Sequence, residues 1–109
     1  MIEHFKIEAL AEIALIRAAN VVAARLGLDP VDVIAPGRAR RTRAQARAFQ
    51  LALYIAQTSG GAPLCRLAEA SWMDRKDLRA EMKRVEEARS SAAFDDFLEE
   101  MEAEYAQLN

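Results

Sequence analysis

Apolar side chains recur along this chain at the three- and four-residue spacing of α-helices, and β-branched residues never alternate over the length of a strand. The pattern predicts a first helix from about Glu3 to Leu26, before Gly27, and a short helix over Pro30–Ile34 with Asp29 as its N-cap. Pro36 then breaks the helical pattern. In the first helix the residues at roughly helical spacing are Phe5, Leu10, Ile13, Ile16, Val21 and Leu26.

A capping box predicts where the third helix begins. Thr42 is followed three residues later by Gln45, so we expect a helix from Arg43 to about Thr58, ended by Gly60-Gly61. A short fourth helix is expected over Pro63–Ala70, with the proline in its first turn.

Two further helices complete the pattern. Asp74 is expected to cap a helix over Arg75–Arg89, whose buried residues are Leu78, Met82 and Val85. Ser90-Ser91 opens an acidic C-terminal helix over about 91–108, with an apolar stripe formed by Phe94, Phe97, Leu98, Met101, Tyr105 and Leu108. We therefore predict an all-α fold of five or six helices in one domain, residues 1–109, with a helix-turn-helix formed by roughly Pro63–Ala70 and Arg75–Arg89.

Length and composition limit the class of protein. The chain has 109 residues, of which 52% are hydrophobic, which suits one helical domain with one modest core. Its single cysteine, Cys65, cannot form an internal disulfide, so a reducing cytoplasm is the expected setting. No apolar stretch approaches a membrane span, and the N-terminus lacks the pattern of a signal peptide.

Charge is distributed unevenly. Residues 38–47 contain five arginines and no acidic residue, whereas residues 90–109 contain six carboxylates and no base. Clustered guanidinium groups hold phosphates, and basic side chains at a helix N-terminus oppose the helix dipole, so a structural role alone explains them poorly. The expected phosphate and minor-groove contacts are Arg38, Arg40, Arg41, Arg43 and Arg47.

The helix from Arg75 carries the second set of candidates. In a helix-turn-helix the second helix enters the major groove, where arginine commonly reads guanine. The expected major-groove residues are Arg75, Lys76, Arg79 and Lys83. The alternative is an exposed face that pairs with Glu86, Glu87 and their neighbours.

From about Val21 to Arg89 the chain resembles the C-terminal DNA-binding domain of the bacterial chromosomal replication initiator, DnaA. The segments that carry the resemblance are Val22–Leu28, Val31–Ile34, the arginine-rich loop and Arg47–Ala56, and the last of these resembles the family's aRq-(I/M)-A-M-Y-L run. Glu86–Arg89 and Phe94-Asp95 are similar to stand-alone alphaproteobacterial relatives of that domain. The resemblance implies a fold similar to Trp repressor and this initiator domain, with Arg40, Arg41 and Arg43 on backbone and minor groove and Arg75 and its neighbours on bases.

The resemblance also has departures. The family's Gly-Arg-Asp-His-Thr/Ser-Thr signature reads Trp72, Met73, Asp74, Arg75, Lys76 and Asp77 in this chain. The initiator's recognition sequence is therefore not expected to carry over. No GxxxxGK[ST] loop is present, which excludes ATP-driven origin melting by this chain alone, and a regulator of transcription or of replication initiation is expected instead.

Other interpretations accompany this one. The chain is expected to be a cytoplasmic, nucleoid-associated non-enzyme without cofactor or metal, because His4 is isolated and Cys65 is expected to be buried. Trp72 is expected to pack in the core or turn, with an exposed stacking role as the alternative. The rival function is a protein–protein adaptor or inhibitor that has lost specific DNA reading. It would use the acidic helix, while the apolar stripe of that helix and the long first helix offer a core or a dimer seam.

Overall fold

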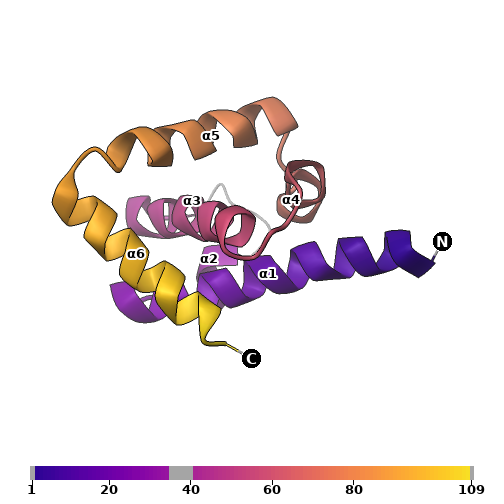
Figure 1. The fold of residues 1–109 in the computed structure, drawn as a ribbon, viewed down its shortest axis with the longest axis horizontal. Coiled ribbons are helices and arrows are strands. Elements are labelled where there is room, and N and C mark those ends of the chain that lie inside the picture. The colour runs from indigo at the N-terminus through magenta and orange to yellow at the C-terminus, as the bar shows by residue number, and fades with distance from the viewer. Residues whose placement is uncertain (1, 35–40, 109) are drawn as a thin grey trace.

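The computed structural model describes residues 2–34 and 41–108, with side chains described from Leu10 onward, and its described residues form helices and connecting turns without strands. The helices are α1 (Ile2–Leu26), α2 (Pro30–Ile34), α3 (Arg43–Thr58), α4 (Leu64–Ser71), α5 (Arg75–Ala88) and α6 (Ala92–Ala106) (Figure 1). The predicted all-α fold is confirmed, and each helix boundary lies within two residues of the one expected. None of the described helices has both the length and the apolar character needed to cross a membrane.

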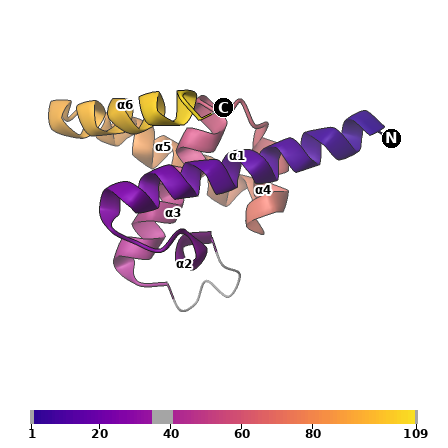
Figure 2. The ribbon, with the colours of Figure 1, turned by 90° about the horizontal axis from the view of Figure 1, so that it is seen from below.

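α3 forms the centre of the domain. Its residues from Leu51 to Ala56 are all buried, and Figure 1 shows it between α1 and α5. Seen from below, α1 crosses α3 and covers much of it (Figure 2). A helical segment that is apolar on every side needs neighbours on every side, and α1, α4, α5 and α6 all supply contacts to α3.

Local side-chain caps fix where α3 and α5 begin. Gln45 N donates to Thr42 Oγ1 at 3.1 Å while Thr42 N donates to Gln45 Oε1 at 2.9 Å, which is the expected capping box. At α5, Lys76 N donates to Asp74 Oδ1 at 2.8 Å. Pro63 differs from expectation, because it is the extended N-cap residue of α4 and lies outside the helix.

The core-facing side of α1 is made of small residues, which the spacing of its large apolar residues does not indicate. Leu10, Ile13 and Ile16 are 62%, 44% and 47% exposed. The buried residues of α1 are Ala11, Ala14, Leu15, Ala18, Ala19, Val21, Val22 and Ala23. Alanine on this face lets the α1 and α3 backbones approach closely, so the larger side chains lie toward solvent.

The acidic helix α6 packs back onto the domain. Leu98 and Met101 are fully buried, and Phe94, Phe97 and Tyr105 are partly buried against the same core. Gly60 permits this approach, because a Cβ there would lie 2.6 Å from the Tyr105 hydroxyl and 2.6 Å from the Ala56 carbonyl oxygen. Apart from Leu108, which is exposed, the predicted apolar stripe is therefore domain core, and Asp96, Glu99 and Glu100 are exposed at the surface.

Candidate nucleic-acid interface

α4 and α5 form a helix-turn-helix arrangement. Trp72, Met73 and Asp74 connect them, and Figure 1 shows α4 nearly end-on beside the N-terminal end of α5. The turn is closed by two backbone hydrogen bonds, from Trp72 N to Glu69 O at 3.3 Å and from Met73 N to Ala68 O at 3.0 Å. The predicted helix pair is thus present at the expected residues.

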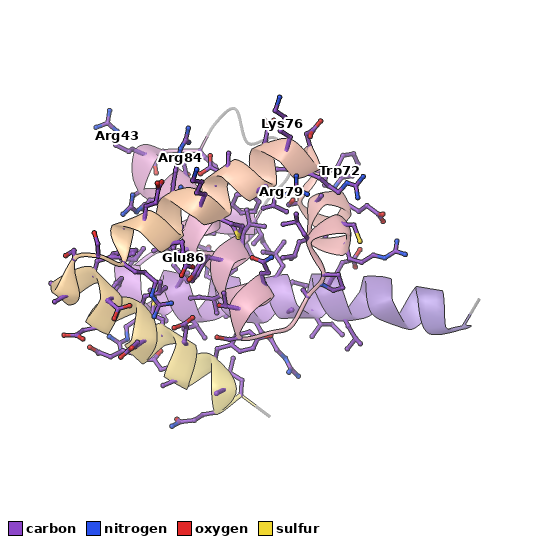
Figure 3. All side chains as sticks on the ribbon, turned by 45° about the horizontal axis from the view of Figure 1, so that its top comes forward. Arg43, Trp72, Lys76, Arg79, Arg84 and Glu86 are labelled. Carbon is purple, nitrogen blue, oxygen red and sulfur yellow. The ribbon has the colours of Figure 1, made fainter. Side chains whose placement is uncertain are left out.

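Three buried residues fix the orientation of α5. Leu78, Met82 and Val85 face α3 and α4, as expected. Because successive residues of a helix are rotated by about 100°, the residues opposite this buried side are Lys76, Ala80, Lys83, Arg84 and Glu87. Figure 3 shows Lys76 and Arg84 extending outward from α5.

Arg84 was missed by the sequence interpretation, although its side chain is 69% exposed. The i, i+4 row of Arg75, Arg79 and Lys83 drew attention to one flank of α5. The sequence could have indicated this exposure. Arg84 lies two residues after Met82 and one residue before Val85, and at about 100° per residue both spacings turn it away from the predicted buried side. Arg75 and Arg79 lie on one flank of α5. Lys76 and Lys83 therefore lie closer than either arginine to the line directly opposite the buried side of the helix.

The opposite flank of α5 faces the first turns of α3. Gln50 Nε2 donates to a carboxylate oxygen of Glu81, and Arg84 Nη1 lies 3.2 Å from the other carboxylate oxygen of Glu81. This flank therefore combines acidic and basic groups, and Glu81 connects α5 to the helix that carries the expected phosphate contacts.

The expected basic segment is only partly described by the structure. Arg38 and Arg40 lie outside the described residues. The Arg41 guanidinium lies 3.8 Å from the centroid of the Phe49 ring and its side chain is half-buried, so part of its surface is used inside the domain. Arg43 and Arg47 are exposed, and the Arg47 guanidinium lies 5.6 Å from the centroid of Phe94.

A shallow groove of about 530 Å³ borders three of the expected phosphate contacts, and none of the four expected major-groove residues lines it. It separates the first turns of α3 from the helix-turn-helix. The lining residues include Arg41, Arg43 and Arg47 on one side and Met73 and Glu81 on the other. Figure 3 shows Arg43 and Lys76 on the same side of the molecule.

Ion pairing distinguishes the two ends of the domain. No ion pair within the described part of the chain involves Arg43 or the four cations expected in the major groove, Arg75, Lys76, Arg79 and Lys83. The proposed structural alternative, pairing with Glu86 and Glu87, is therefore not what these residues do. Cations without a carboxylate partner are available to an external anion.

Two arginines near α6, Arg25 and Arg89, are instead bound to carboxylates. Arg25 binds Glu100 at 3.1 Å and Glu104 at 2.5 Å. The hydrogen bonds to these two carboxylates raise the pKa of Arg25. Because Arg25 is bound in this way, it contributes to the attachment of α6.

Arg89 is the centre of a second network. Its guanidinium binds Asp95 at 2.5 Å and Glu102 at 3.2 Å, and donates to the Tyr54 hydroxyl at 3.2 Å. Tyr54 in turn donates to Glu86. Burial would lower the pKa of Arg89, but these hydrogen bonds outweigh it and raise the pKa above the ordinary value. The network joins α3, α5 and α6.

Two expectations about single residues were wrong. Trp72 is 78% exposed, because the left-handed backbone at this residue, with φ of 61°, turns its side chain away from the core. Cys65 is also exposed, because the buried residues of α4 are Leu67, Ala68 and Ser71 on another side of the helix. Both residues were predicted to be buried, and neither is part of the core.

One trio of potential metal ligands occurs in the described residues. Ligand oxygens of Asp95, Asp96 and Glu99 lie within 4.8 Å of one another on α6. Arg89 already occupies Asp95, and Asp96 and Glu99 are exposed to water, so the trio is an acidic surface without a built cation site.

The chain matches no protein-family model, no curated protein and no solved structure.

Proposed function

We propose that the protein binds double-stranded DNA, with α5 in the major groove and the first turns of α3 on the adjoining sugar–phosphate strand. The observation that carries this proposal is the segregation of unpaired cations. Arg43, Lys76 and Lys83 lack ion pairs within the described residues, whereas Arg25 and Arg89 are each bound to two carboxylates. If these cations served only to stabilise the domain, we would expect Arg43, Lys76 and Lys83 to bind carboxylates as Arg25 and Arg89 do.

The outward side of α5 suits a major groove. The groove is about 12 Å wide and accepts one helix. Ala80 lies at the middle of the outward side, where a methyl group permits close approach to base edges, and Lys76 and Lys83 lie one turn to either side along the helix. Arg84 extends from the same side, but its guanidinium is paired with Glu81 and would have to leave that carboxylate to read guanine.

The groove beside α5 supports contacts to the DNA backbone. Arg43 and Arg47 lie on its α3 side, about where the strand bordering an occupied major groove would run. α6 forms another surface of the domain, with Asp96 and Glu99 exposed there. The negative surface of α6 repels phosphate, so it limits the orientations in which the domain can approach DNA.

The biological role we propose is regulation of transcription or of replication initiation by a nucleoid-associated cytoplasmic protein. The resemblance of the sequence to the DnaA DNA-binding domain supports it. The altered residues Trp72, Met73, Lys76 and Asp77 imply a target site different from that of the initiator.

The test is the salt dependence of binding to a fluorescently labelled duplex, measured by anisotropy. Each phosphate contact contributes about 0.9 to the slope of log K against log salt. Arg43→Ala should reduce the slope by about one such contact, because Arg43 is placed against the DNA backbone. Arg17→Ala, which removes an exposed arginine from α1, is the matched control and should leave the slope unchanged.

Equal effects of Arg43→Ala and Arg17→Ala would show that binding follows net charge and would contradict the proposed orientation. Absence of DNA binding by a folded protein would favour the adaptor alternative. That alternative has its own support in the exposed Leu10, Ile13 and Ile16 of α1, which form an apolar surface suited to another protein.

A further inference from the structure

Trp72 is the only tryptophan of the chain and its largest exposed side chain among the described residues. It lies in the turn of the helix-turn-helix, two residues before the Asp74 cap of α5. With 78% of its surface exposed, it contributes little to the core. A ring of this size in contact with water at such a position calls for a partner outside the domain.

The backbone at Trp72 strengthens this argument. Its φ of 61° and ψ of 33° are left-handed, and no other non-glycine residue in the described part of the chain has positive φ. Glycine is the residue that this conformation favours at the end of a helix. Trp72 therefore occupies a strained position without recovering the cost through burial, which is typical of residues with a function.

The surroundings of the ring indicate its partner. Trp72 lines a hollow together with Glu69, Met73 and Arg75. Figure 3 shows Trp72 at the end of the helix-turn-helix where α5 begins. In a helix-turn-helix this end of the second helix approaches the bases most closely, so a DNA strand bordering the groove there passes the indole.

We infer that Trp72 contacts the sugar–phosphate backbone of duplex DNA, with its indole face against a deoxyribose and its N–H donating to a phosphate oxygen. Indole combines an apolar face with one polar donor, which matches a sugar flanked by phosphates. The inference rests on the proposed function and deepens it. Trp72 is a positioning residue that holds the N-terminal end of α5 in the groove and adds affinity without adding charge.

Fluorescence makes this inference directly testable, because all indole emission comes from Trp72. The protein is titrated with a labelled duplex, and DNA anisotropy and tryptophan emission are recorded on the same samples. We expect emission to change in parallel with anisotropy. Trp72→Gly removes both the apolar contact with the sugar and the hydrogen bond to the phosphate, so it should weaken binding by roughly tenfold.

Two variants separate this contact from a structural role. Trp72→Gly suits the left-handed backbone, so its melting temperature should stay within a few degrees of the wild type while its DNA affinity falls. Its slope of log K against log salt should equal that of the wild type, because no cation is removed. Leu10→Ala, which shortens an exposed apolar side chain on α1, is the control and should retain full affinity.

The outcomes are distinct. DNA binding with unchanged emission and unchanged affinity of Trp72→Gly overturns the inference and leaves the proposed function standing. Emission that changes with protein concentration in the absence of DNA identifies a contact between copies and also overturns it. Failure of anisotropy to rise with any duplex contradicts the proposed function itself, and the inference with it.

Discussion

Replacing Arg89 with methionine should destabilise the domain by about 2–3 kcal/mol. The guanidinium is 19% exposed and makes hydrogen bonds with Asp95, Glu102 and Tyr54. Hydrogen bonds to charged groups contribute about 1.5–3 kcal/mol each, but Asp95 and Glu102 are 34% and 20% exposed and regain some water when Arg89 is removed. The net loss is therefore closer to that of one or two such bonds.

The assay is thermal unfolding followed by circular dichroism. A domain of this size loses about 4–8 °C per kcal/mol, so Arg89→Met should melt roughly 10–20 °C below the wild type. The matched control is Arg25→Met, since Arg25 also binds two carboxylates of α6. Arg25 forms its ion pairs at the surface, where water and salt screen them. Arg25→Met should therefore lower the melting temperature far less than Arg89→Met does.

A double variant tests the physical cause. Once Arg89 is absent, the Glu102 carboxylate stays partly buried without its cation. Arg89→Met combined with Glu102→Gln should therefore be more stable than Arg89→Met alone. Equal melting temperatures for Arg89→Met and Arg25→Met would refute the claim that the partly buried network, rather than α6 charge in general, holds α3, α5 and α6 together.

Three further predictions use local contacts. Thr42→Ala removes the capping box and should lower the free energy of unfolding by about 1 kcal/mol in a urea titration. Glu81→Gln removes a negative charge from the basic groove while its amide can still contact Gln50, so DNA affinity in the anisotropy assay should rise; a fall would show that the carboxylate contacts DNA. Burial and the hydrogen bond to Glu86 raise the pKa of Tyr54 from its ordinary 10.0, so ionisation favours the unfolded chain and stability should fall as the pH rises above about 10. Tyr54→Phe should reduce this alkaline loss in melts at pH 9 to 11, and an unchanged loss would assign it to other groups.

The helices were predictable because their boundaries are encoded locally. Thr42 and Gln45 form a cap within one turn, and Asp74 binds the backbone two residues later, so neither helix start needs information from distant parts of the chain. The burial of Leu78 and Met82 followed from helical spacing in the same way.

The features that were missed depend on distant residues. The face that α1 buries is set by the close approach of α3, so the alanines are buried and Ile13 is exposed. The left-handed conformation of Trp72 depends on how α4 ends, which periodicity does not indicate. Arg89 binds Tyr54 and Glu102, which are 35 and 13 residues away in the sequence.

The central claim is that α5 and the first turns of α3 form the DNA-binding surface. The most direct measurement is the change in backbone amide chemical shifts of the ¹⁵N-labelled protein as a short duplex is added. The account predicts that the largest changes occur at residues 41–47 and 72–84, while α6 (Ala92–Ala106) remains unperturbed. Changes concentrated on α6 or on α1, or no changes at saturating DNA, would contradict it.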